Sequence, residues 1–307
     1  MAMIDPFAPS AFNTMALTAA INILPNNYGR LEELGLFPVK PTRNRNIVVE
    51  EQNGILNLLQ TASPGAPASV GRRGKRVVRS FVIPHIPHDD VVLPEEVQGL
   101  RAYGSENNLE AYSEVLARHL QSMRNKHAIT LEHLRMGALK GIILDADAST
   151  IYNLYTEFGI TAKTISFALT TASTNVLGKC LELKRHIEDN LKGETSNGVR
   201  CLVSEGFYDS LVSHANVKAA YASYQEASQR LGGDMRKGFT FGGVTFEEYR
   251  GTATDADSNA RAFIAANEGH AFPEGTMDTF STHVGPGNFN ESANTLGQLL
   301  YAKQEPR

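Results

Sequence analysis

The chain has 307 residues, of which 42% are hydrophobic and 20% charged, and its formal net charge at pH 7 is -4. This composition is ordinary for a folded protein with a core, and the charge gives the whole chain no bulk attraction to nucleic acid or anionic membranes. The two cysteines, Cys180 and Cys201, exclude a disulfide-dense scaffold and a zinc site built from several cysteines. We expect both thiols to be reduced and buried.

Neither a membrane span nor a secretory signal is expected. No apolar run approaches the roughly 20 residues of a transmembrane helix. The opening MAMIDPFAPS contains an acidic residue and no basic region, unlike a signal peptide. We therefore expect the chain to fold in a cytoplasm.

The first third of the chain predicts segments without a core of their own. Residues 1–45 read as an arm, in which prolines and turn formers surround one short apolar helix. Residues 46–98 carry strand and turn signals, and the stretch 47–59 predicts two strands joined at Asn53-Gly54. So long a segment without its own core is uncommon inside a compact domain. We expect it to lie on another molecule, most simply a second copy of the chain.

The longest predicted element is an amphipathic helix from Ser105 to Gly141. Ser105 is a suitable N-cap and Gly141 a suitable stop. At 1.5 Å per residue a continuous helix here is on the order of 50 Å long, more than a compact domain of this size normally holds. Thr130 offers a second cap, so the alternative is a break near Ala128, and we expect the helix to bend at Thr130. The apolar face is predicted to consist of Leu109, Tyr112, Leu116, Leu120, Met123, His127, Leu131, Leu134 and Ala138.

Periodicity and turn signals predict the remaining elements. In chain order these are two strands around an Asp-rich turn (141–159), a β-prone stretch (160–174), a helix (176–193), a strand (199–205), two helices (206–214 and 216–233) and a hairpin (239–251). Residues 252–307 are predicted to be rich in loops, with short strands near their end.

Asp145 and Asp147 are the strongest candidates for catalysis. An Asp-x-Asp after an apolar strand is typical of haloacid-dehalogenase-like phosphatases, in which the first Asp is the nucleophile and the second the general acid and base. Here the motif follows a long helix, and the next residues, TIYNLY, predict a continuing strand instead of a helix. An Asp-rich hairpin turn is the simpler interpretation.

The sequence HIPHDD places four possible metal ligands close together: His85, His88, Asp89 and Asp90. Ligands on one extended stretch usually need partners elsewhere, and the two prolines stiffen this one. We favour a polar segment that contacts a neighbour over a metal site.

The densest basic cluster comprises Arg72, Arg73, Lys75, Arg76 and Arg79. One alternative function is therefore a nucleic-acid-binding module that acts through residues 72–79. No aromatic residues interleave with the cluster, which argues against a platform that stacks single-stranded bases. A solvated loop, or an ion-pairing surface for an acidic neighbour, fits better. No nucleophile elbow, Walker loop or dinucleotide fingerprint is present.

Five stretches carry a resemblance to a known family. They are LTAAINILPNNYGRLEELGLF (17–37), TRNRNIVVEEQNGILNLL (42–59), ITLEHLRMGALKGIILDADASTIYNLYTEFG (129–159), FEEYRG (246–251) and NTLGQLLYAKQ (294–304). In order and spacing they are similar to the phage major capsid protein E family, the lambda-type capsid proteins. Asp145, Ala146 and Asp147 fall at that family's own Asp-rich hairpin turn. Relatives typically have Gly after the second Asp, where this chain has Ala148.

The resemblance implies an α+β chain with the Hong Kong 97-type major capsid fold. Its parts would be an N-terminal arm (1–45), an extended β-hairpin loop (46–98), a peripheral domain with a long spine helix (99–174), an axial domain (175–270) and a C-terminal return to the peripheral region (271–307).

The resemblance also implies a structural protein without cofactor, metal or catalytic residues. Copies would assemble in the host bacterial cytoplasm into hexamers and pentamers of an icosahedral shell around double-stranded DNA. A scaffolding protein, a portal and a decoration protein would be further partners. The residues expected at contacts between subunits are Arg72, Arg73, Lys75, Arg76, Arg79, His85 and His88.

Overall fold

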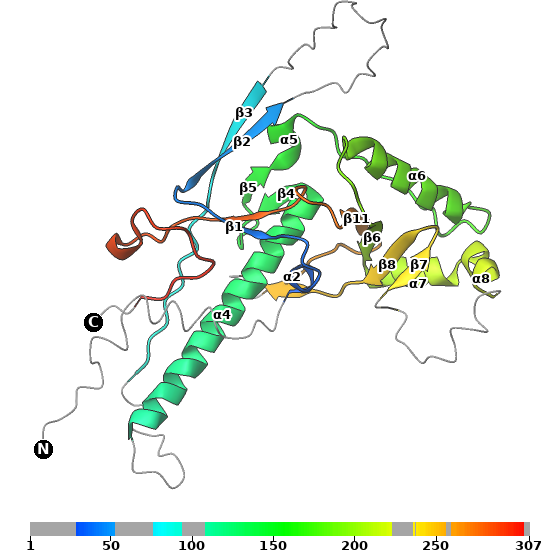
Figure 1. Cartoon of the computed structure of the whole chain (residues 1–307). Helices are drawn as coiled ribbons and strands as arrows, with labels where there is room; N and C mark the ends of the chain where they lie inside the picture. The colour runs from blue at the N-terminus through cyan, green and yellow to red at the C-terminus, as the bar shows by residue number, and fades with distance from the viewer. Residues whose placement is uncertain are drawn as a thin grey trace, which may run out of the picture. The chain divides into compact units, whose positions relative to one another are not determined.

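The computed structural model describes residues 29–52, 76–93, 108–222, 236, 238–255 and 259–303. Within these ranges the chain is α+β, as predicted (Figure 1). The helices are α2 (Arg30–Glu33), α4 (Asn108–Lys140), α5 (Leu154–Phe158), α6 (Val176–Asn190), α7 (Glu205–Ser213), α8 (Ala215–Ala222) and the 3-10 helix η3 (Asn290–Ser292). The strands are β1 (Val39–Pro41), β2 (Asn46–Gln52), β3 (Arg76–Val82), β4 (Ile142–Leu144), β5 (Thr150–Asn153), β6 (Gly198–Val203), β7 (Phe239–Phe241), β8 (Val244–Glu248), β9 (Thr252–Thr254), β10 (Ala260–Ala262), β11 (Gly269–Glu274) and β12 (Thr282–Val284).

The chain divides into two units, which we describe separately. Among the described residues, the first unit takes 39–52, 76–89 and 283–303. In it β2 and β3 form an antiparallel ribbon, with Asn46 opposite Val82 and Gln52 opposite Arg76. The strand at residues 76–82 was not predicted, since the basic segment read as a loop. The predicted turn at Asn53-Gly54 and the strand after it lie outside the described residues, as does the predicted arm helix.

A close backbone approach joins the C-terminal part of the first unit to its β strands. The amide of Gly297 donates a hydrogen bond to the Thr42 carbonyl at 2.8 Å. A Cβ at Gly297 would overlap the backbone of Val284 and Gly285. Only glycine fits here without moving the main chain.

The second unit is built on a four-stranded sheet with the order β11-β6-β8-β7. The central strands β6 and β8 are parallel, and both outer pairs are antiparallel. Alternate residues of β6 point to opposite faces, so Val199, Cys201 and Val203 enter one apolar cluster and Leu202 enters another. The sheet is therefore covered on both sides.

The two apolar clusters account for the packing of the helices of this unit. The first unites side chains of α6, α7 and α8 with Val244 and Phe246 of β8, all fully or nearly fully buried. The second joins Leu31 of α2 and Met136 of α4 to Leu202 and Phe272. Burying each such large side chain contributes roughly 1.5–3 kcal/mol.

The long helix is confirmed as α4, which runs without interruption over 33 residues. The break considered near Ala128 is wrong, and the bend expected at Thr130 is not visible in Figure 1. The Thr130 hydroxyl donates to the Lys126 carbonyl four residues earlier at 2.8 Å, so it joins the helix instead of capping a new one. Gly141 ends the helix, as predicted, at a φ of 83°. Ser105 lies outside the described residues.

The buried face of α4 is only partly the predicted one. Leu120 is buried as expected, but Leu131 and Leu134 are only half-buried. The buried side chains in the second half of the helix include Glu132, Arg135 and Met136. The spacing of apolar residues did not predict this buried face, because two of its residues, Glu132 and Arg135, are charged.

Most other predicted elements are confirmed. The structure contains the strands around the Asp-rich turn (β4 and β5), helices α6 and α7, strand β6, the start of the helix at 216–233 (α8) and the hairpin β7–β8. The β-prone stretch 160–174 contains no strand, so that prediction is wrong. Two further differences concern TIYNLY, which is strand only to Asn153 before α5, and the C-terminal region, whose last described strand ends at Val284.

Candidate assembly surfaces

One face of the β2–β3 ribbon carries three exposed valines. Val48, Val78 and Val82 are 58%, 56% and 55% exposed. They share one face, because their cross-strand partners in the register are Ser80, Glu50 and Asn46, and opposed residues point the same way. We call Val48, Val78 and Val82 the valine face. The same face also carries the exposed polar residues Asn46, Glu50 and Ser80. A two-stranded ribbon is marginally stable alone, and exposed apolar side chains on it are candidates for burial against a neighbour.

The extended segment after β3 contains the predicted histidine and aspartate cluster. His85 and Asp89 are exposed and His88 is half-buried. Asp90 instead faces α4: its Oδ2 lies 2.8 Å from Nδ1 of His119, and its Oδ1 accepts the Val91 amide at 3.0 Å. The hydrogen bond from His119 lowers the pKa of Asp90. Across the described ranges no three His, Cys, Asp or Glu side chains gather as metal ligands.

The basic cluster is only partly within the described residues. Arg72, Arg73 and Lys75 lie outside them, and only the backbone of Arg76 is described. Arg79 is half-buried on β3 opposite Val49. The predicted roles of these residues, and of His85 and His88, at subunit contacts stay predictions.

Asp145 and Asp147 form the turn between β4 and β5. Asp145 Oδ1 accepts the Ala146 amide at 2.7 Å, and Asp147 Oδ1 accepts the Ser149 amide at 2.8 Å. Hydrogen bonds from Ser149 lower the pKa of Asp147. Ala148 adopts a left-handed φ of 67°, a backbone conformation that glycine adopts more easily than alanine. Both carboxylates are exposed and serve the turn.

A buried charge network, which sequence reasoning missed, ties α2 to the sheet. Glu247 on β8 accepts from Nε and Nη2 of Arg30, at 2.6 and 3.1 Å, and from Arg200 of β6 at 2.6 Å. Arg200 also binds Glu274 of β11 at 2.5 Å, and Arg30 binds Glu33 at 2.7 Å. The Glu247 carboxylate raises the pKa of Arg30. Two guanidinium groups thus compensate the charge of one buried carboxylate.

A second part of this network fixes α2 to α4. Glu132 Oε1 accepts the Leu31 amide and the Tyr249 hydroxyl, each at 2.9 Å. Arg135 donates to Glu32 at 2.9 Å. Burial and the neighbouring Glu132 raise the pKa of Tyr249. In sequence Glu132 and Arg135 resemble the surface charges of any amphipathic helix, so no signal identified them.

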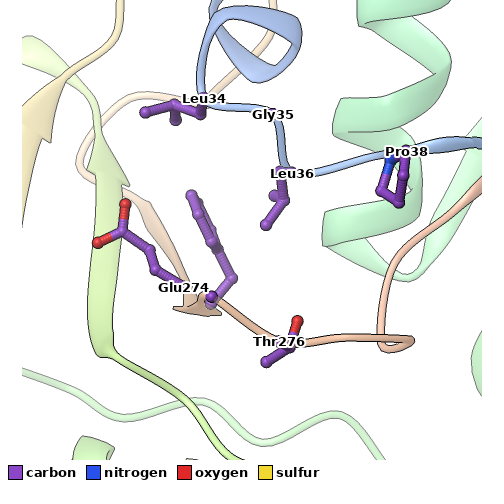
Figure 2. A pocket seen from close by; sticks show the side chains of 8 residues that line it. Leu34, Gly35, Leu36, Pro38, Glu274 and Thr276 are labelled. Atoms are coloured by element: carbon purple, nitrogen blue, oxygen red, sulfur yellow. The ribbon is translucent and has the colours of Figure 1, made fainter.

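A surface recess lies beside α2, between the segment 34–38 and the end of β11 (Figure 2). Its volume is about 180 Å³. The lining residues are Leu34, Gly35, Leu36, Pro38, Phe272, Glu274, Gly275 and Thr276. Most of its lining side chains are apolar, but most of the surface exposed inside it is polar.

Both cysteines are buried and reduced, as predicted. Burial raises the pKa of Cys180 and of Cys201 to about 12. Burial in an apolar environment makes both thiols poor nucleophiles. None of the described helices has the length and apolar character needed to cross a membrane.

Comparison with known proteins shows which family this chain is similar to. A family model for phage major capsid protein E matches residues 13–307. The major capsid protein of Pseudomonas phage KPP10 is 33% identical over 313 residues, which cover 97% of this chain and 89% of the relative. The major capsid protein of Salmonella phage Felix O1 is 31% identical over 323 residues, covering 95% of this chain and 87% of the relative.

These matches define a class: structural proteins of phage capsids. This chain belongs to the phage major capsid protein E family, as its sequence pattern predicted. Its members are components of the virion capsid and are not enzymes. One argument against the phosphatase, that no helix follows the motif, was wrong, because α5 begins at Leu154. Family membership and the turn geometry of Asp145 and Asp147 reject that alternative instead.

Proposed function

We propose that copies of this chain assemble into hexamers and pentamers of an icosahedral phage head that encloses double-stranded DNA without sequence-specific binding. Assembly takes place in the host bacterial cytoplasm around a scaffolding protein, with a portal at one vertex and a decoration protein outside. Family membership supports this proposal. The chain has the Hong Kong 97-type fold in this proposal, with the arm, extended loop, spine helix, peripheral domain and axial domain assigned from sequence.

Parts of the described structure support the proposed division of the chain. The β2–β3 ribbon falls within the proposed extended loop, residues 46–98. The 33-residue helix α4 falls within the proposed peripheral domain, residues 99–174, and suits a spine. The sheet strands β6, β7 and β8 fall within the proposed axial domain, residues 175–270.

The observation that carries the proposal is the valine face. Each valine is somewhat more than half exposed, and burying a whole Val side chain contributes roughly 1.5 kcal/mol, so covering all three yields about 2.5 kcal/mol for each ribbon. A contact this weak does not hold two isolated subunits together. In a closed shell every subunit makes it, and multivalency turns many weak contacts into a stable particle.

In this proposal the charged residues predicted at subunit contacts contribute less to particle stability than the valine face does. Arg72, Arg73, Lys75, Arg76 and Arg79, with His85 and His88, surround the apolar contact in sequence. Charged groups at the edge of an interface mainly steer association and set its register. Their substitution should change the rate and salt dependence of assembly more than the stability of finished particles.

Size-exclusion chromatography and negative-stain microscopy of the expressed chain, alone and with its scaffolding protein, test the proposal. Rings, capsomers or shells are expected. A triple variant, Val48→Ser with Val78→Ser and Val82→Ser, should stay folded by circular dichroism yet fail to assemble. Ile160→Ser is the matched control, since Ile160 is an equally exposed aliphatic residue outside the ribbon, and it should assemble. A parent chain that remains a monomer under both conditions refutes the proposal.

A further inference from the structure

The chain passes from the first unit to the second between Asp89 and Asp90. Residues 83–93, which cross this boundary, adopt neither helix nor strand. Pro84 and Pro87 keep the segment extended and remove two backbone donors. Because the segment belongs to no sheet, side-chain contacts become important for fixing it.

Asp90 fastens the start of the second unit to α4. Its Oδ2 lies 2.8 Å from Nδ1 of His119, which is the distance of a charge-assisted hydrogen bond. Its Oδ1 accepts the amide of Val91 at 3.0 Å. One carboxylate thus orders the backbone beside it and joins that backbone to a helical residue 29 positions further along the chain.

The helix holds His119 in place without hiding it from solvent. Val115 and Leu120, on either side of it in sequence, are buried and anchor this part of α4. The side chains of His119 and Asp90 are 24% and 33% exposed. Partial burial protects the pair from full screening by salt, whereas the remaining exposure lets protons reach it. The pair therefore responds to the pH of the solution.

Asp90 stays ionised over the pH range in which histidines titrate. The hydrogen bond from His119 lowers the pKa of Asp90 below its ordinary value of 3.8, burial opposes this change, and the charge of Lys126 adds to it. The carboxylate therefore loses its charge, and with it this contact, only in stronger acid.

The charge of His119 decides the strength of the pair near neutral pH. Histidine ordinarily takes up its proton near pH 6.5. A protonated imidazole forms an ion pair with Asp90, whereas a neutral one offers a single uncharged donor. The described charged groups nearby are Lys126, two turns further along α4, and Asp89 and His88, adjacent on the segment. Asp89 favours the protonated imidazole, and Lys126 and a protonated His88 oppose it.

We propose that Asp90 and His119 form a pH-sensitive latch between residues 90–93 and α4. Below about pH 6 an ion pair closes the latch, and toward pH 8 the latch weakens because only a neutral hydrogen bond remains. Residues 90–93 directly follow the first unit, so the latch controls how freely the chain moves where that unit joins the second. The inference concerns the single subunit and goes beyond the proposed function.

Hydrogen exchange of the unassembled full-length chain tests the latch. Exchange in peptides that cover residues 83–93 is followed by mass spectrometry at pH 5.5 and 7.5 and corrected for the intrinsic chemical rate at each pH. We expect residues 90–93 to be about threefold better protected at pH 5.5 than at pH 7.5. His119→Gln keeps a donor but does not titrate, so protection should be equal at the two pH values. Asp90→Asn leaves α4 unchanged and should remove the pH dependence as well.

His133→Gln is the matched control, because His133 is another half-buried histidine of α4 and its ring contacts Phe263. This variant should keep the threefold difference in protection. Equal protection of the parent chain at both pH values overturns the inference, and so does a difference that persists in His119→Gln or Asp90→Asn. Since the measurement uses unassembled subunits, its failure leaves the proposed function intact, and a chain that never assembles leaves this test intact.

Discussion

Removing the charge of Glu247 tests whether the buried network holds α2 on the sheet. Its side chain is 6% exposed and binds both Arg30 and Arg200. In Glu247→Gln an amide that also donates hydrogen bonds faces these two guanidinium groups. Breaking a buried pair costs about 3–5 kcal/mol when the remaining charge has no other partner. Here each arginine keeps one carboxylate, Glu33 or Glu274, so we expect a loss of about 2–3 kcal/mol.

Urea denaturation of the unassembled subunit measures this loss. With an m-value on the order of 3 kcal/mol per molar, the midpoint should fall by about 1 M. Glu33→Gln is the matched control, because Glu33 binds the same Arg30 but is 71% exposed, and it should cost less than about 0.5 kcal/mol. Equal losses of stability in the two variants would refute the reasoning that burial makes the ion pairs of Glu247 more stabilising than the exposed pair of Glu33. An unchanged urea midpoint in Glu247→Gln would refute it as well.

Three further predictions follow from backbone geometry and burial. Ala148→Gly should raise the free energy of unfolding by about 0.5–1 kcal/mol in urea titrations, because it relieves a left-handed Ala, whereas Ala146→Gly in the same turn should give no gain; equal effects would contradict this. Gly297→Ala should lower the apparent melting temperature in calorimetry, because its Cβ overlaps backbone at the end of β12 that cannot rotate away; an unchanged transition would show that the main chain adapts freely. Burial lowers the pKa of His133 and of His270, so these residues bind protons more readily in the unfolded chain, and subunit stability should fall as the pH drops from about 6.5 toward 5. The double variant His133→Gln/His270→Gln should reduce this pH dependence of the urea midpoint. An unaltered pH dependence would assign the effect to other groups.

Local patterns predicted those parts of the fold that depend on neighbours in sequence. The α4 helix, its stop at Gly141 and the Gly242-Gly243 hairpin each follow from periodicity or from a residue that tolerates positive φ. The helix after β5 carried a readable signal that was overlooked. Asn153 accepts the amides of Tyr155 and Thr156, which is ordinary N-capping.

Pairing between distant segments was not predictable in the same way. The partner of β2 begins at Arg76, far along the chain, and neither its basic composition nor any turn signal indicated a strand there. The threonines of 160–174 favour strands by propensity, yet Thr174 donates to the Ala168 carbonyl and stabilises a local turn. The burial of Glu132 and Glu247 depends on which elements pack over them, and a single sequence does not contain that information.

The Glu247 network also has a mechanical consequence. β8 is flanked by β6 and β7, so it is an interior strand of the sheet. Tension applied to the chain before Arg30 is therefore transmitted to β8, in the middle of the sheet, through the two hydrogen bonds from Arg30 to Glu247. It passes on to β6 and β11 through the bonds of Arg200 to Glu247 and Glu274. Pulling on this point loads several strands together instead of peeling one from an edge.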